Sequence, residues 1–117
     1  MRLPIIRGEL VFQGSPADIG GAAVHVLVED VSRADGPAQT VGAWSVAGLA
    51  QGTTSSKAIP FDVQLNALDT RGRYSLRAHV DVDRDGQTSI GDFITMEEYP
   101  VGGTGADFYR LQVHRVE

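Results

Sequence analysis

The stretch "RYSLRAHVDV", residues 73–82, decides the fold class of this chain. Apolar and polar residues alternate along it, so that one face carries Tyr74, Leu76, Ala78, Val80 and Val82. A period of two residues is typical of a β-strand that packs one face against a core and leaves the other toward solvent. The run therefore predicts a half-buried strand.

Similar strand-like runs lie on both sides of it. We expect strands at residues 8–12, 22–32, 38–49, 59–65, 93–101 and 107–116, separated by segments rich in Gly, Pro, Ser and Asp. The sequence has no long helical periodicity. It predicts one all-β domain over residues 1–117, an antiparallel β-sandwich of about seven strands in two sheets. The core positions that follow from the alternation are Val24, Val26, Val28, Phe61, Val63, Leu65, Tyr74, Leu76, Ala78, Val80, Leu111 and Val113.

Composition limits the function classes. A chain of 117 residues with 42% hydrophobic and 21% charged residues fits one packed domain. It has no cysteine, which excludes disulfides, cysteine zinc sites and thiol chemistry. The net charge of −5 argues against nucleic acid, and no apolar stretch is long enough to span a membrane. The first twelve residues show no signal-peptide pattern, so the cellular location is unknown, with the cytoplasm as the default expectation.

The segment "DVDRDGQTSIGD", residues 81–92, follows the decisive strand directly. Its four aspartates and one arginine contribute −3 to the net charge of −5, which indicates a bound cation. Oxygen-bearing residues stand at positions 1, 3, 5, 9 and 12 and glycine at position 6, the plan of a twelve-residue calcium loop. The predicted ligands of one Ca²⁺ are Asp81, Asp83, Asp85, the backbone carbonyl of Gln87, Ser89 directly or through water, and Asp92.

The loop differs from a helix-flanked calcium sensor. It ends in Asp92 where Glu is usual, Thr88 stands at the normally apolar eighth position, and both flanks are strand-like. The terminal Asp is closer to the dockerin form of the loop. The alternative is a solvated turn, but four carboxylates repel one another and Arg84 alone does not neutralise them. We therefore expect calcium in a structural role, because magnesium usually retains several waters.

A metal-dependent hydrolase is the alternative function. "VDVDRDGQT" superficially resembles the nucleophile segment of haloacid-dehalogenase-like phosphatases, with Asp83 as nucleophile and Asp85 as acid. That family requires a parallel α/β domain and a lysine after the segment, whereas Lys57, the sole lysine, precedes it. The three histidines, His25, His79 and His114, alternate with inward positions and are expected on outer faces toward solvent.

Four segments of the chain carry a family resemblance. They are "VHVLVEDVSRADGPAQTVG" (24–42), "IPFDVQ" (59–64), "RYSLRAHVDVD" (73–83) and "YPV" (99–101). Together they resemble the YscW/YbaY group of small lipoproteins related to type III secretion pilotins. The resemblance implies a β-sandwich, a periplasmic location, no enzymatic activity and, for the pilotin members, assistance to an outer-membrane secretin. The calcium-type loop is then an addition to a strand connection.

The expected function is therefore a non-enzymatic, calcium-stabilised β-sandwich that acts as an interaction or adaptor module, related to the envelope or to secretion. Its partner is an unknown protein. A sandwich also has sheet edges, and Lys57, Pro60 and Pro100 guard them only in part. A weak homodimer through edge pairing is expected for that reason.

Overall fold

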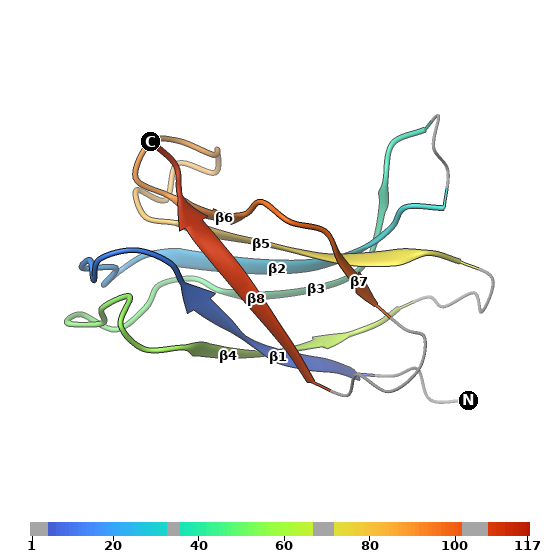
Figure 1. Ribbon diagram of the computed structural model, residues 1–117, viewed down its shortest axis with the longest axis horizontal. Coiled ribbons are helices and arrows are strands. Elements are labelled where there is room, and N and C mark those ends of the chain that lie inside the picture. The colour runs from blue at the N-terminus through green and yellow to red at the C-terminus, as the bar shows by residue number, and fades with distance from the viewer. Residues whose placement is uncertain (1–4, 33–35, 67–71, 102–107) are drawn as a thin grey trace.

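The computed structural model describes residues 5–32, 36–66, 72–101 and 108–117. These residues form eight strands and no helix (Figure 1). The strands are β1 (Ile5–Phe12), β2 (Ala23–Asp30), β3 (Gln39–Val46), β4 (Ile59–Gln64), β5 (Tyr74–Asp81), β6 (Phe93–Thr95), β7 (Tyr99–Val101) and β8 (Phe108–Arg115).

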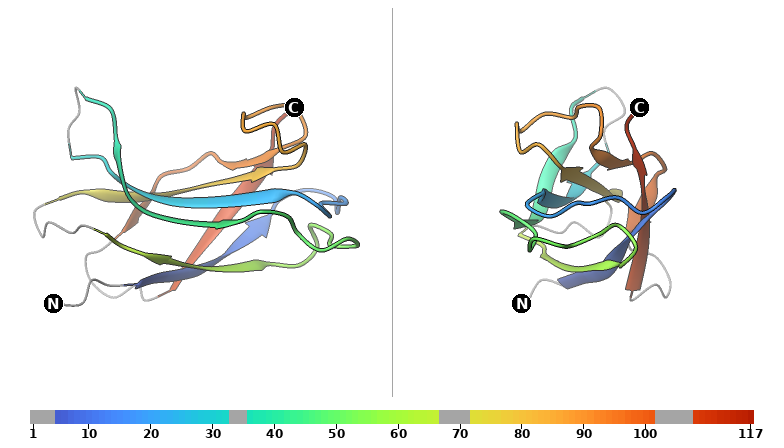
Figure 2. Two further views of the ribbon diagram at one scale, coloured as in Figure 1. Left: turned by 180° about the vertical axis from the view of Figure 1, so that it is seen from behind. Right: turned by 90° about the vertical axis from the view of Figure 1, so that its left-hand side faces the viewer.

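All eight strands belong to one sheet, in the order β3-β2-β5-β6-β8-β1-β4, with β7 also paired to β5. The sheet curls around the core, as the two views of Figure 2 show. Its ends, β3 and β4, meet where Gly42 bridges Leu65 and where the backbone N–H of Asn66 donates to the carbonyl of Val41 at 2.8 Å. The all-β domain is therefore a nearly closed, barrel-like sheet.

This architecture differs from the predicted sandwich of about seven antiparallel strands in two sheets. The predicted strand 93–101 is divided into β6 and β7. His79 pairs with Ile94 and Leu76 with Tyr99, so three steps along β5 match five along the partner segment. The two additional residues interrupt the ladder between β5 and its partner segment. β6 pairs with both β5 and β8, so the strands expected in two layers form one continuous sheet.

The first and last strands are neighbours and run in parallel. Arg7 of β1 is in register with Phe108 of β8, and Phe12 with Val113. Every other strand pairing in the sheet is antiparallel. The parallel pair is a second departure from the predicted antiparallel sandwich, because strand pattern alone does not distinguish the two directions.

The core lies inside the curled sheet. All twelve positions that alternation predicted as core are buried. Val82 is only partly buried and packs against the core from its margin. Ile19 and Ala22, in the connection between β1 and β2, are also fully buried. The period of two therefore identified the inward faces of the strands, but not the apolar residues that a connection adds to the core.

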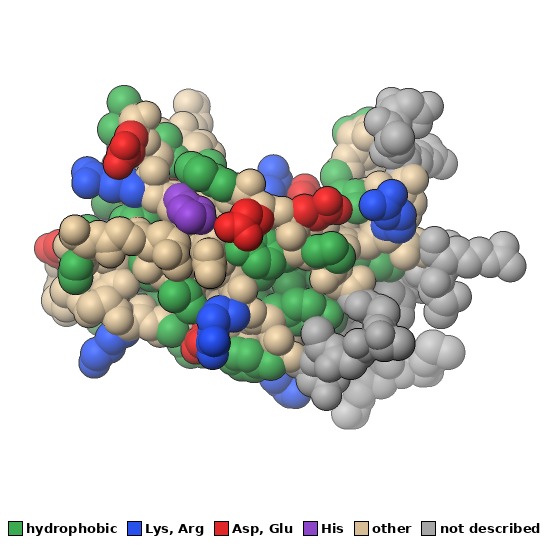
Figure 3. Space-filling model, in the orientation of Figure 1, with side chains coloured by type: hydrophobic (Ala, Val, Ile, Leu, Met, Phe, Trp, Pro, Cys, Tyr) green, Lys and Arg blue, Asp and Glu red, His purple; other side chains and the backbone are tan. Residues whose placement is uncertain are grey.

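One face of the described residues carries side chains of mixed character. On the face shown in Figure 3, acidic, basic and hydrophobic side chains are interspersed, without a broad basic patch. In the part of the chain that the structure describes, no helix has the length and hydropathy of a membrane span.

Candidate metal centre

The acidic loop, residues 82–92, leaves the end of β5 and returns to β6 beside the end of β8 (Figure 1). The N–H of Gly91 donates to the carbonyl of Val116 at 2.9 Å, and the N–H of Val116 donates to the carbonyl of Asp92 at 2.8 Å. The last residue of the loop is thus fixed to the C-terminal end of the sheet.

Hydrogen bonds within the loop wrap it around its own carboxylates. The N–H of Gly86 donates to Asp81 Oδ2 at 2.9 Å, and the N–H of Gln87 donates to Asp85 Oδ1 at 2.9 Å. Gly86 has a φ of 79°, in the left-handed region that glycine adopts without strain. The sharp turn that the sequence predicted at this glycine is therefore present.

Four aspartates converge inside the wrap. Asp81, Asp83, Asp85 and Asp92 each offer a carboxylate oxygen, and these four oxygens lie within 4.8 Å of one another. Asp81 and Asp92 are buried, at 2% and 1% exposure, and the other two are exposed. Asp81 and Asp92 are eleven residues apart in the sequence, and the turn of the loop brings their carboxylates together.

Ser89 lies among these carboxylates, as predicted. Its Oγ is 3.1 Å from Asp83 Oδ2, 3.4 Å from Asp85 Oδ2 and 3.4 Å from Asp92 Oδ2. A hydroxyl has one hydrogen, so it donates fully to only one of these oxygens at a time. The other carboxylate oxygens near Ser89 lie close together, and the neutral hydroxyl does not offset their negative charge.

Asp81 provides the strongest sign that a ligand belongs here. Its Oδ1 is buried and has no hydrogen-bond partner among the described residues. A buried carboxylate oxygen is costly unless a hydrogen-bond donor or a metal satisfies it. Calcium takes six to eight oxygens at about 2.3–2.6 Å, which allows two ligand oxygens to be up to about 5 Å apart. The spacing and the all-oxygen donor set therefore fit Ca²⁺.

The exposed Asp83 is held in its ionised form. Desolvation raises its pKa, but the hydrogen bonds that it accepts from the Asp85 N–H and the Ser89 hydroxyl lower it and outweigh this effect. The pKa of Asp83 is consequently lowered from its ordinary value of 3.8. At neutral pH this side chain is a carboxylate and suits a cation ligand.

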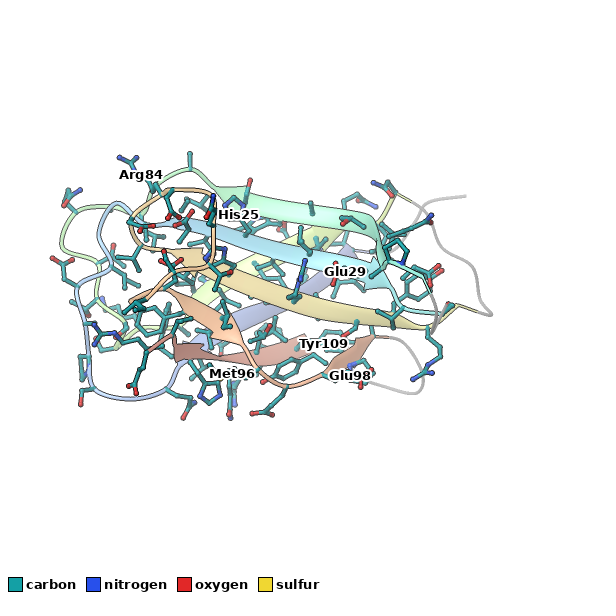
Figure 4. All side chains as sticks on the ribbon, turned by 90° about the horizontal axis from the view of Figure 1, so that it is seen from above. His25, Glu29, Arg84, Met96, Glu98 and Tyr109 are labelled. Carbon is teal, nitrogen blue, oxygen red and sulfur yellow. The ribbon has the colours of Figure 1, made fainter. Side chains whose placement is uncertain are left out.

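For Gln87, the structure gives a backbone N–H bonded to Asp85 and an exposed side chain. The predicted role of its carbonyl as a ligand stays a prediction. Arg84, the one basic residue of the loop, points outward at the edge of the molecule (Figure 4). Among the described residues, no ion pair joins it to the loop carboxylates.

The expectation that the His79 side chain points to solvent was wrong. Its Nε2 lies 2.8 Å from Asp92 Oδ2, and its side chain is 21% exposed. Alternation correctly put His79 on the outer face, but the loop covers that face. His25 is exposed, and its ring centroid is 6.3 Å from that of His79. His114, on β8, has its Nε2 3.7 Å from Glu97.

An open pocket of about 590 Å³ lies between the loop and the outer face of β2, β5 and β6. His25 lies beside the loop in Figure 4. The pocket is lined by His25, Leu27, Arg77, Ala78, His79, Gly86, Thr88, Ile94 and Thr95. His25 of β2 and His79 of β5 therefore both lie next to the loop.

No family model matches this chain, and no curated protein matches it. Among solved structures, it is similar to an alternative pilotin from the type II secretion system of Vibrio cholerae, with 22% sequence identity and a TM-score of 0.78. The match covers 99% of each chain. It shows a shared pilotin-like fold across the length of the domain, and this fold differs from the parallel α/β domain that a haloacid-dehalogenase-like phosphatase requires.

Proposed function

We propose that this protein is a non-enzymatic, secretion-related adaptor of the pilotin type. The observation that carries the proposal is the likeness of fold to a type II secretion pilotin over 99% of both chains. The sequence resemblance to the YscW/YbaY group is consistent with it and rests on strand segments from both halves of the chain. The metal-dependent hydrolase is less favoured, because its sequence resemblance belongs to a different fold class.

The proposed partner is the secretin of the same cell, and the proposed location is the periplasm. A pilotin-type role requires a protein surface for docking, not a catalytic cleft. The face shown in Figure 3 carries mixed side chains and is compatible with a protein partner.

The adaptor role is tested in the cells that make the protein. Chemical crosslinking, affinity purification and mass spectrometry should identify the secretin subunit, and deletion of the gene should lower the amount of assembled secretin. Re-expression of the protein should restore assembly. Normal secretin assembly in the deletion strain, together with no secretin among the crosslinked products, would contradict the role. The hydrolase alternative predicts phosphoester cleavage by the purified protein with Ca²⁺ or Mg²⁺.

The same protein is proposed to bind one Ca²⁺ through Asp81, Asp83, Asp85 and Asp92, with Ser89 and the Gln87 carbonyl completing the shell. The four convergent oxygens and the unpartnered Asp81 Oδ1 support this site. Calcium would neutralise the loop and hold the end of β5 against the end of β8. Its role is structural, because the site joins strands of one sheet.

The calcium site is tested by thermal unfolding of protein freed of metal by EDTA. Calcium at about 100 times its dissociation constant should stabilise the fold by about 2.7 kcal/mol, and the titration should reach millimolar concentrations. Asp83→Ala and Asp85→Ala should remove most of the rise in melting temperature. Asp62→Ala, which removes an exposed carboxylate from β4, is the matched control and should retain it. Identical melting curves of the wild type with EDTA and with excess calcium would refute the site.

A further inference from the structure

A second donor set overlaps the four-carboxylate cluster. His79, Asp81 and Asp92 each offer one ligand atom, and these atoms lie within 4.8 Å of one another. This set is more buried than the calcium set, because both exposed aspartates are absent from it. It also differs in chemistry, since it contains an imidazole nitrogen.

Two segments of the chain, the end of β5 and the end of the loop, supply this donor set. His79 and Asp81 are two residues apart on β5, so their side chains leave the same outer face of the strand. The loop then returns Asp92 to that face, where its Oδ2 lies 2.8 Å from His79 Nε2. Residues that alternation places toward solvent are in this way enclosed by the loop.

Both carboxylates are oriented by backbone donors. Asp92 Oδ1 accepts the N–H of Val82 at 2.9 Å, and Asp92 Oδ2 accepts the N–H of Ser89 at 3.1 Å. Asp81 Oδ2 accepts the N–H of Gly86 at 2.9 Å, whereas Asp81 Oδ1 has no partner among the described residues. Such supporting hydrogen bonds fix metal ligands and raise affinity. The unpartnered oxygen leaves one ligand position ready.

One imidazole and two carboxylates suit a transition metal better than calcium, which prefers oxygen alone. Zinc binds nitrogen at about 2.0–2.1 Å and carboxylate oxygen at about 2.0–2.2 Å in a tetrahedron, which places two ligand atoms roughly 3.3 Å apart. The observed 2.8 Å between His79 Nε2 and Asp92 Oδ2 must therefore widen by only about half an ångström. Three protein ligands would leave the fourth position of the tetrahedron to a water molecule.

We propose that His79, Asp81 and Asp92 form a transition-metal site suited to Zn²⁺. The site shares two ligands with the proposed calcium site but depends on His79 in place of Asp83 and Asp85. The two proposals are therefore separable by substitution, and zinc binding does not require that calcium binds.

The test is calorimetric titration of the metal-free protein with ZnCl₂, supported by the visible spectrum of the Co²⁺ form, which reports nitrogen and oxygen ligation. His79→Gln should weaken zinc binding at least tenfold while keeping a side chain that donates to Asp92. His114→Gln removes a partly exposed histidine of β8 that is not a proposed ligand and should bind zinc as the wild type does. Asp83→Asn should also keep zinc binding, although it should lose the calcium response.

Circular dichroism in EDTA verifies that each variant is folded, and His79→Ala serves as a second variant if His79→Gln does not fold. Equal zinc affinity of wild type and the His79 variant would overturn the site. Loss of zinc binding in His114→Gln to the same extent as in His79→Gln would also overturn it, since that result indicates surface histidines in general. An unchanged Co²⁺ spectrum in the His79 variant would count against imidazole ligation.

Discussion

Asp81 shows how a strand position acquires a chemical role. It is the last residue of β5 and lies opposite Ala23 in the ladder with β2. Its side chain leaves the outer face, yet it is only 2% exposed because the loop covers it. One carboxylate oxygen is satisfied by Gly86 and the other is not. Because a buried carboxylate oxygen without a partner costs free energy, we expect Asp81 to destabilise the metal-free protein.

Asp81→Asn therefore has opposite effects without and with calcium. In EDTA the amide removes a buried charge and keeps an oxygen for the Gly86 N–H, so we expect a gain in unfolding free energy of about 1–3 kcal/mol. With millimolar calcium the variant should show little further stabilisation and should be equal to or less stable than the wild type. Urea unfolding under both conditions measures this. A variant less stable than the wild type in EDTA would show that Asp81 is not strained in the metal-free protein.

The sequence predicted burial on the inward faces of strands because burial there follows from a local period of two. It did not predict that His79 is covered, which depends on a loop that folds back over the outer face. It did predict that Asp81, Asp83, Asp85, Asp92 and Ser89 converge, since the spacing of the aspartates and Gly86 encodes the turn itself. The local part of the site was predictable, and the part made by tertiary contact was not.

Among the strands, the interruption between β6 and β7 is the main departure from expectation. Two additional residues lie opposite β5, and Met96, Glu97 and Glu98 are exposed there. The sequence of 93–101 alone did not predict this, because a bulge is set by the register of the partner strand. At the interruption, the N–H of Ala78 donates to Thr95 Oγ1 at 3.2 Å.

Thr95→Val tests the contribution of that hydroxyl. Valine keeps the shape and the β-propensity of threonine but leaves the Ala78 N–H without its acceptor, so the unfolding free energy should fall by about 1–3 kcal/mol. Thr88→Val, at an exposed position of the loop, is the control and should change it by less than about 0.5 kcal/mol. Chemical denaturation measures both, and amide hydrogen exchange should be faster at Ala78 in the Thr95 variant alone. Equal stability of the two variants would show that solvent or another group replaces the hydroxyl.

Closure of the sheet depends on how closely β3 and β4 approach each other. Gly42 lies within β3, and a glycine in a strand interior usually weakens the strand. In the structure it bridges Leu65, and a Cβ atom there would lie 2.9 Å from Val63 Cγ1 and 3.0 Å from the carbonyl oxygen of Gln64. The absence of a side chain lets the two ends of the sheet meet. Closure leaves fewer strand edges open for pairing than a two-sheet sandwich would have. Weak self-association of the wild type stays a prediction.

Gly42→Ala should open this seam. The added methyl group forces the ends of the sheet apart, which we expect to cost about 1–3 kcal/mol of unfolding free energy and to free two strand edges for pairing with another copy. Gly48→Ala is the matched control, since its Cβ would meet no atom nearer than 3.5 Å and its reduced unfolded-state entropy should leave stability equal or slightly higher. Denaturation and sedimentation over a range of concentrations measure the two effects. Because the clash and the exposed edges arise from one displacement, Gly42→Ala should lower the unfolding free energy and raise self-association together. If it remains as stable and as weakly associated as Gly48→Ala, the contact between β3 and β4 does not hold the sheet closed.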